Sequence, residues 1–585
     1  MRFLFISLLE VASLVRAGAG NITLAVQPAL PHIFFVVVDD FGWGEVGYHR
    51  AVETPDVRTP HIDSLVEEGI ALERHYVHMI CTPSRASFQT GRLPVHLLTE
   101  LAGPCDRNGA IPRNMTGLAA VLKRAGYATH QVGKWDVGMA TSHHTPKGRG
   151  YESSLNYFSH GNWMYTEAEW LGSYNKRADI PLPGIIDFWD TDRPARHLNG
   201  TGYEEYIFRD RMLHILRTHD QSKPLFLQYD SKIAHYPLQA PLEYQHRFQH
   251  IQEDHRRVYS AMISFLDDQL ANITGTMKEL GMWEQTLMVL SSDNGGYVLA
   301  FDGACNTTGP APAGSGAGPA SDAGHGTACF NGEAGGSNFP LRGGKYSNFE
   351  GGIRVNAFVS GGFLPASVRG SKQSHIMHIA DWYRTLAQGI AGVDPTDHWA
   401  AESGLPPIDS IDMWPILSGA NMTPPREDIL FTEDLLVRGR WKYVRGSTPM
   451  DLAGWAGPEY PNISTASNPI SDYSFRCPAR GCLYDVVDDP SEQREVSAAH
   501  PDVVASMASE LERQARGIWK TRHEEDPLCR RAAAELYGGF YGPFQEVVGW
   551  PSGEVDTTIE LLHRRTRRLR IKRARERSLS ISSWK

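Results

Sequence analysis

The 585-residue sequence is short of positive charge, has few cysteines and, beyond its N-terminus, lacks any long apolar run. Its net charge of −10 at pH 7 argues against general nucleic-acid binding, because such binding needs a basic surface. No stretch after the first 20 residues is long and apolar enough to span a bilayer. The rest of the composition, 41% hydrophobic and 21% charged, is typical of a soluble globular protein, and the length favours two domains.

The N-terminus has the pattern of a secretory signal peptide. Within residues 1–20, Arg2 precedes an apolar run that ends in small residues. Glu10 interrupts this run, which leaves a short membrane anchor as the alternative. Seven N-x-[ST] sequons follow, at Asn21, Asn114, Asn199, Asn272, Asn306, Asn421 and Asn462. Together these features predict a glycoprotein of the secretory pathway, secreted or held in a lysosome-like lumen, with no transmembrane span.

Oxygen-bearing side chains follow two stretches that have the pattern of buried strands. His32–Val38 is an apolar run of strand length, as in a central parallel strand, and Thr286–Leu290 is another. The side chains that come soon after them are Asp39, Asp40, Asp293 and Asn294. Open α/β sheets bind ligands at the carboxyl ends of their strands, and hard oxygen donors favour Ca²⁺ or Mg²⁺ over zinc. We therefore expect a divalent-cation site; for the first pair the alternative is an Asx turn that caps a helix.

The segment Cys81–Arg92 reads C-T-P-S-R-A-S-F-Q-T-G-R. It resembles the signature of the type I sulfatases, C-x-P-S-R followed by T-G-R. The resemblance implies that a formylglycine-generating enzyme oxidises Cys81 to formylglycine, that Arg85 steadies this group, and that the group joins the calcium ligands. A hydrated aldehyde offers two hydroxyls, one to attack sulfur and one to expel sulfate afterwards, whereas a serine hydroxyl is a weak nucleophile. The alternative is a structural or disulfide cysteine beside a turn.

A second block, Gly133–Gly138, reads G-K-W-D-V-G and resembles the family's G-K-W-H-L-G element. Lys134 matches the lysine that holds sulfate. Asp136 stands where the family usually has histidine, and this is the largest departure from the family pattern. A carboxylate could serve as the base at this place, but it would add negative charge beside an anionic substrate.

Two further blocks complete the resemblance. His235–Pro241 matches H-x-P-x-x-x-P, so His235 is expected to contact sulfate or to protonate the leaving oxygen; the alternative is a capping or surface histidine. Residues 340–354 match P-L-R-G-x-K-x-x-x-x-E-G-G-x-R and place Lys345 as the second sulfate-binding lysine. Glycines beside Lys345 permit a close backbone approach.

The periodicity of the chain predicts several helices and strands. Thr59 is expected to cap a helix that opens at Pro60, and another helix is expected to begin after Ser84. Other expected helices span residues 118–125, 203–219, 254–280 and 501–519. Expected strands span residues 127–132, 224–229, 429–432, 441–444 and 483–486.

Seven cysteines are an odd number, and conversion of Cys81 would leave six to pair. Cys305/Cys329 and Cys477/Cys482 are close in sequence, which leaves Cys105 and Cys529 for each other. The first pair would close a Gly/Ala/Ser-rich loop within residues 303–336. This loop could lie at the mouth of the pocket, or it could be a spacer without a functional role. A basic run in residues 563–577 could bind polyanions, or it could be a solvated tail.

The resemblance implies an α/β fold, an alkaline-phosphatase-like sandwich around a large mixed sheet with a smaller C-terminal α+β domain. The expected limits are 1–20 for the signal peptide, 21–425 for the catalytic domain, 426–540 for the α+β domain and 541–585 for the tail. Within the family the sequence looks most like the arylsulfatase B, or N-acetylgalactosamine-4-sulfatase, group.

The function implied is calcium-dependent hydrolysis of a sulfate monoester, an aryl or sugar sulfate, by an arylsulfatase-type enzyme. One alternative is a phosphate- or phosphonate-ester hydrolase on the same scaffold, because sulfate and phosphate share tetrahedral geometry. Another is a sulfated-glycan-binding protein that has lost turnover, and Asp136 is its support.

Overall fold

A computed structural model describes residues 30–50, 53–162, 164, 185–252, 254–298, 327–328, 335–448 and 475–545. The expected signal peptide, the Cys305/Cys329 pair and the basic run all lie outside these residues. A ten-stranded mixed sheet dominates, in the order β13-β2-β12-β10-β1-β8-β4-β5-β6-β7. Its strands are β1 (His32–Val38), β2 (Ile70–Leu72), β4 (Ala128–Lys134), β5 (Ser153–Tyr157), β6 (Trp189–Asp190), β7 (Arg193–Pro194), β8 (Leu225–Ser231), β10 (Thr286–Ser292), β12 (Ala357–Ser360) and β13 (Ser371–Gln373).

The middle of this sheet is parallel. Strands β10, β1, β8, β4 and β5 pair in parallel, while β12 joins β10 antiparallel. Every residue of β1, β8 and β10 is buried, as expected of strands covered on both faces. The expected α/β sandwich around a mixed sheet is therefore confirmed, and the carboxyl ends of these five neighbouring strands meet along one edge.

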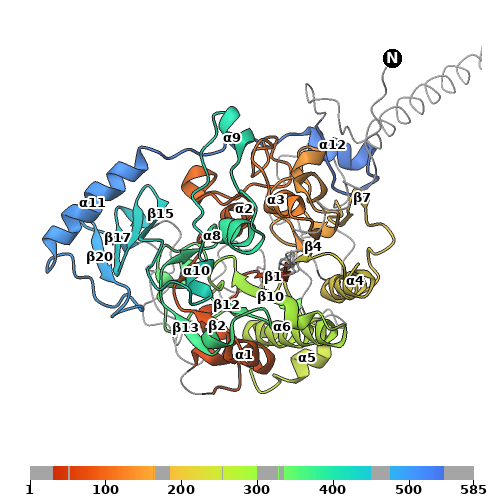
Figure 1. Cartoon of the computed structure of the whole chain (residues 1–585), viewed down its shortest axis with the longest axis horizontal. Coiled ribbons are helices and arrows are strands. Elements are labelled where there is room, and N and C mark those ends of the chain that lie inside the picture. Colours follow the sequence, from red (N-terminus) through yellow and green to blue (C-terminus); the bar gives the residue numbers. More distant parts are fainter. Residues whose placement is uncertain are drawn as a thin grey trace, which may run out of the picture. The chain divides into compact units, whose positions relative to one another are not determined.

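Helices cover both faces of the sheet (Figure 1). On one face lie α2 (Cys81–Thr90), α3 (Leu118–Arg124) and α8 (Asp381–Arg384). On the other lie α1 (Pro60–Glu67), α4 (Glu204–Thr218) and α6 (Asp254–Glu279), and α6 also packs against α5 (Leu242–His246). The predicted bounds of α3, α4 and α6 differ from these by one residue or two.

Two helix starts differ from the sequence-based expectation. Thr59 precedes α1, but its side chain makes no cap; instead the Asp267 carboxylate of α6 accepts from the backbone N–H of His61 at 3.1 Å and of Ile62 at 2.7 Å. A distant carboxylate thus satisfies donors that a local cap would otherwise bind. Helix α2 begins at Cys81 rather than after Ser84, so this cysteine lies at the positive end of the helix.

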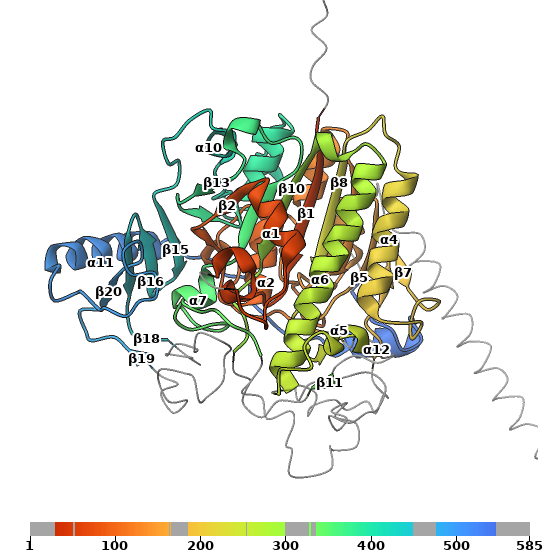
Figure 2. The same ribbon diagram turned by 90° about the horizontal axis from the view of Figure 1, so that it is seen from below.

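A separate four-stranded antiparallel sheet lies to one side of the main sheet (Figure 2). It contains β15 (Asp428–Thr432), β16 (Leu435–Arg438), β17 (Trp441–Val444) and β20 (Cys482–Asp485), with α11 (Pro501–Ala515) packed on it. The sequence analysis did not predict β16. The smaller α+β region is confirmed, while its expected limits at 425 and 540 stay predictions.

The small sheet shares a core with the larger part of the chain. Tyr76 and Phe349 pack in the same buried cluster as residues of β15, β16, β17 and β20. Lys442 of β17 is fully buried and pairs with Glu350 at 3.3 Å and Glu492 at 2.9 Å. Because Glu350 belongs to the block that carries Lys345, the small sheet helps to hold a site segment in place.

Two of the expected disulfides are present, Cys105–Cys529 and Cys477–Cys482. Cys81 is the free cysteine of the described chain, and it is buried. Among the described residues, no helix has both the length and the apolar content that a membrane crossing requires.

The Cys105–Cys529 bond ties α12 (Leu528–Glu535) to a segment 424 residues earlier in the chain. A cross-link between such distant residues removes much of the unfolded chain's freedom. We expect Cys529→Ser to lower the free energy of unfolding by about 2–4 kcal/mol. Thermal melting of the variant measures this, with Cys482→Ser as the control: its loop spans only 5 residues, so its loss should be smaller. Equal losses from the two variants would contradict the chain-entropy argument.

Candidate active site

The predicted site residues converge where the central parallel strands end. Asp39 and Asp40 follow β1, while Asp293 and Asn294 follow β10 beside it. On the other side of β1, the chain leaving β8 brings His235, and β4 ends at Lys134. All of these residues are at most 7% exposed.

Three carboxylates and one amide form the oxygen-rich floor of the site. The Asn294 Nδ2 donates to Asp40 Oδ1 at 2.7 Å, and the Asp40 backbone N–H donates to Asp293 Oδ1 at 3.3 Å. Burial raises the pKa of Asp40, and burial together with the charge of Asp39 raises the pKa of Asp293 to about 7. Both shifts disfavour the ionised form of these carboxyls, so an added positive charge beside them would stabilise it.

This floor fits a hard divalent cation. Within the described residues, the buried Asn294 Oδ1 has no hydrogen-bond partner, although a buried acceptor normally finds one. One ligand atom from each of Asp39, Asp40, Cys81 and His235 lies within 4.8 Å of the others. Carboxylate and amide oxygens are the donors that Ca²⁺ takes in proteins, and a cation here would offset the clustered negative charge.

Cys81 lies directly over these carboxylates, with Sγ 3.6 Å from Asp39 Oδ1. Its side chain is 1% exposed. Burial raises the pKa of the thiol well above its usual value, although Lys134 and Lys345 act in the opposite direction. The group therefore stays a neutral thiol near pH 7, and a neutral thiol is a poor nucleophile. The position suits a reactive group, but an unmodified cysteine there would be inert.

Arg85, one helical turn after Cys81 on α2, joins the site to the sheet. Its guanidinium contacts Asp293 at 2.8 Å and Asp230 at 3.2 Å, and it lies 4.0 Å from Asp39. These carboxylates keep the pKa of Arg85 above its usual value despite burial. Sequence reasoning missed Asp230, which is near the end of β8. A carboxylate directly after the predicted strand 224–229 was the available signal.

Two lysines supply the positive charge above the floor. Lys134 Nζ lies 2.8 Å from Asp39 Oδ2, and Lys345 Nζ lies 2.7 Å from Asp40 Oδ1. Burial alone would lower the pKa of each lysine, but the facing aspartates outweigh it and raise the pKa. Both lysines therefore remain charged in a buried place, which is what binding of an anion requires.

His235 lies against the same cluster, with Nε2 3.9 Å from Asp40 Oδ2. Its Nδ1 is 2.5 Å from the carbonyl oxygen of Tyr236, so Nδ1 carries the hydrogen and Nε2 faces the cluster. Burial and the charge of Lys345 hold the pKa of His235 well below its usual value. The ring is therefore neutral, and the capping or surface role considered for it is excluded by its position.

Asp136 is at the site but is already engaged by other side chains. It is fully buried, and its Oδ1 lies 2.6 Å from His160 Nδ1. Its Oδ2 accepts from Thr82 Oγ1 at 3.1 Å and lies 3.6 Å from Lys134 Nζ. Burial alone would raise the pKa of Asp136, but His160 and Lys134 hold it below its usual value. Sequence reasoning missed His160, which belongs to none of the recognised blocks.

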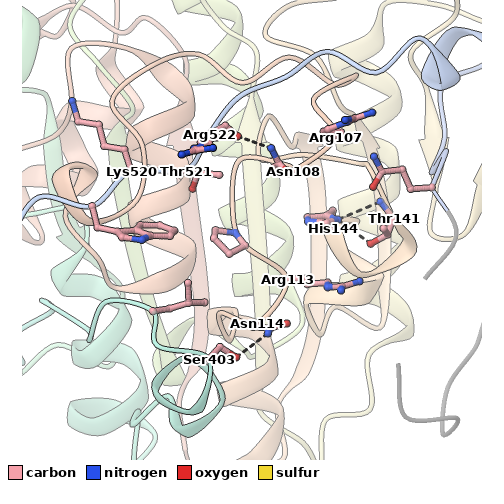
Figure 3. Close-up of a pocket in the computed structure, with 14 residues that line it drawn as sticks. Arg107, Asn108, Arg113, Asn114, Thr141, His144, Ser403, Lys520, Thr521 and Arg522 are labelled. Carbon is pink, nitrogen blue, oxygen red and sulfur yellow. Dashed lines mark hydrogen bonds between the residues drawn. The ribbon is translucent and has the colours of Figure 1, made fainter. Parts of the chain in front are cut away.

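A surface pocket of about 750 Å³ contains none of the predicted site residues (Figure 3). Its lining is basic, but Arg107 pairs with Glu524 at 3.2 Å and Lys520 with Glu433 at 3.1 Å. Asn114, which begins one of the sequons, also lines it. We therefore assign no catalytic role to this pocket.

Comparison with known proteins agrees with this geometry. A family model described as Sulfatase matches residues 31–392. Mouse arylsulfatase J is 29% identical over 539 residues, which cover 88% of this chain and 80% of the relative. Pig N-acetylgalactosamine-6-sulfatase is 26% identical, over 70% of each chain. The crystal structure of Ps i-CgsB in complex with k-i-k-neocarrahexaose matches with a TM-score of 0.62 at 22% identity, covering 84% of this chain and 94% of that one.

Proposed function

Because the chain belongs to the sulfatase family and is a sulfuric ester hydrolase, we propose that it hydrolyses a sulfate monoester with Cys81 in the formylglycine form and one bound Ca²⁺. One observation carries the proposal. The ligand atoms of Cys81, Asp39 and Asp40 lie within 4.8 Å of one another, and a buried charged lysine contacts each aspartate. The inert character of the unmodified thiol supports conversion by a formylglycine-generating enzyme.

The residues of the site suit both the proposed Ca²⁺ and the proposed formylglycine. The proposed calcium ligands are Asp39, Asp40, Asp293, Asn294 and the modified Cys81. When bound, the cation and the aldehyde hydrate supply an acidified hydroxyl nucleophile. Arg85 binds Asp293 and so holds this floor carboxylate in a fixed position relative to α2, which carries Cys81.

The side chains of the protein provide binding and proton transfer. Lys134 and Lys345 neutralise the sulfate oxygens, and their charge is held close to where further negative charge develops as the ester bond breaks. His235, neutral and with Nε2 toward the cluster, contacts the sulfate or exchanges a proton with the leaving oxygen. The buried position of all three groups excludes water, which strengthens each of these interactions.

The substrate class that we propose is a sulfated sugar or an aryl sulfate. The named relatives act on such esters according to their names, and one structural neighbour was solved in complex with k-i-k-neocarrahexaose. The finer likeness to the N-acetylgalactosamine-4-sulfatase group stays a prediction. Disulfides on the described chain support passage through the secretory route to a secreted or lysosome-like location.

The test is sulfate release from a panel of sulfated polysaccharides and aryl sulfates, run beside matched aryl phosphates. We expect release of sulfate from at least one substrate and a higher kcat/KM for sulfate than for the matched phosphate. A preference for phosphate would favour the hydrolase alternative. Binding of sulfated glycans without any release would favour the turnover-impaired alternative.

Lys345→Ala removes one of the two charges that face the sulfate. We expect kcat/KM for sulfate release to fall by about 10²–10³-fold, the loss typical of one electrostatic stabiliser of the transition state. Lys372→Ala, which removes an exposed lysine on β13, is the control and should leave kcat/KM unchanged. Similar activity in the two variants would remove Lys345 from the site.

A further inference from the structure

We propose that His160 is a catalytic residue of this sulfatase and that Asp136 is its positioning residue, so that a carboxylate–imidazole pair performs the proton transfer at this side of the site. The inference rests on the proposed function and adds one residue and one role to it. It also accounts for the aspartate at position 136. In this assignment Asp136 does not meet the substrate; it orients the ring that does.

Both oxygens of Asp136 are already engaged, so neither is available to the substrate. One oxygen lies 2.6 Å from His160 Nδ1, and the other accepts from Thr82 Oγ1 and faces Lys134. The side chain is fully buried. A carboxylate held in this way is compensated by its neighbours, so its charge repels an anionic ester much less than a free carboxylate would.

His160 lies at the wall of the site. Its Nδ1 is 3.4 Å from the hydroxyl of Thr82, the residue that follows Cys81. The next residue, Gly161, lies against the ring of His235; a Cβ at this glycine would approach His235 Nδ1 to 3.1 Å. The 160–161 segment therefore contacts both the helix that starts at Cys81 and the neutral histidine of the cluster.

The tautomer of the His160 ring suits proton transfer. Asp136 is a carboxylate and can only accept, so Nδ1 carries the hydrogen, and in the neutral ring the lone pair is on Nε2. Nε2 makes no hydrogen bond to any other described residue, and the side chain is 27% exposed. A ring with one nitrogen fixed by a buried carboxylate and the other free toward solvent is arranged as a general base.

The chemistry follows from this tautomer. Hydrolysis adds water across the S–O ester bond: one proton ends on the alcohol that leaves, and the other is released to water as the sulfate dianion departs. Nε2 of His160 accepts a proton from the reacting hydroxyl, and Asp136 stabilises the imidazolium through Nδ1–H. The proton then returns to water through the exposed edge of the ring, so the residue ends each turnover neutral.

A purely structural role would be to neutralise Asp136, and asparagine separates the two roles. The Asn side chain places an N–H₂ near the position of Nδ1, so His160→Asn keeps a donor to Asp136 but removes the proton acceptor at Nε2. His160→Ala removes both. His214→Ala, on the exposed face of α4, is the matched control.

The experiment measures kcat and KM for sulfate release by these three variants, each checked by thermal melting. We expect both His160 variants to lose about 10²-fold or more in kcat with little change in KM, since general base catalysis contributes on this scale. Added imidazole should restore part of the kcat of His160→Ala. A wild-type kcat in His160→Asn, or a loss confined to KM, would overturn the proposal.

Different results would contradict the proposed function and the proposed role of His160. If wild-type protein releases sulfate and His160→Asn matches it, the role of His160 is wrong and the proposed function stands. If wild-type protein prefers a phosphate ester, the proposed sulfatase function is wrong. The same variants are then compared on that phosphate ester, and their kcat values decide the role of His160. Wild-type protein that hydrolyses neither ester would overturn both.

Discussion

Replacing Cys81 by alanine should lower kcat for sulfate release by about 10⁴-fold or more, the scale seen when a nucleophile is removed from an enzyme. The expectation follows from the place of Cys81 beside Asp39 and between two charged lysines. No other described cysteine is free to replace it, because the rest are paired in disulfides. Burial of the small side chain means that alanine leaves only a small cavity, so the fold should persist.

The same experiment tests the chemical form of residue 81. Mass spectrometry of the peptide that contains it should find formylglycine in wild-type protein from a host that has the generating enzyme. Cys81→Ser, which keeps a hydroxyl but cannot be converted in that way, should be nearly as inactive as Cys81→Ala, because an ordinary hydroxyl is a weak nucleophile. Full activity in protein whose Cys81 remains a thiol would contradict the formylglycine proposal, and unaltered melting of Cys81→Ala is the control for folding.

Much of the site could be predicted because several of its functional side chains come directly after strands that the sequence pattern identifies. The apolar run of β1 identifies a central parallel strand, and Asp39 and Asp40 come directly after it. The same logic applies to Asp293 and Asn294 after β10. Carboxyl ends of parallel neighbours meet at one edge whatever the loops between them do, so local pattern is enough to bring these groups together.

Other features could not be predicted because they depend on pairings between distant segments. Asp267 caps α1 from 205 residues away, and that contact replaces the cap expected from Thr59. Asp230 follows a predicted strand, but no local pattern connects it to Arg85, with which it forms an ion pair in the structure. His160 carries no motif, and only the fold brings it to Asp136.

Asp136 shows how much the interpretation of a single position depends on its neighbours. From sequence alone, an acidic residue in place of the family's histidine supported lost turnover as one alternative. In the structure the carboxylate is compensated by Thr82 and His160, and an imidazole is present a short distance away. The departure at one position is thus matched by a second residue that no local pattern connects to it.

Removal of divalent cations should abolish sulfate release, and Ca²⁺ should restore it. Asp293→Asn should raise the Ca²⁺ concentration needed for half-maximal activity by about 100-fold or more, since even residues that only orient metal ligands cost 10–100-fold when replaced. The physical reason is that Asp293 is a carboxylate of the floor, where burial and the charge of Asp39 raise its pKa to about 7, and a bound cation would favour its ionised form. The measurement is a Ca²⁺ titration of activity after chelation.

Asp230→Asn is the matched control, because Arg85 contacts both aspartates but only Asp293 belongs to the floor with Asp40. If Asp293 acts as a ligand, the Ca²⁺ requirement should rise in Asp293→Asn and stay at the wild-type value in Asp230→Asn, even where turnover falls in both. If Asp293 serves only to hold Arg85, the two variants should lose activity alike, with no change in Ca²⁺ requirement. Activity that survives exhaustive chelation in wild-type protein would contradict the cation site itself, because Asp40 and Asp293 would then have to stay ionised in a buried place without a cation beside them.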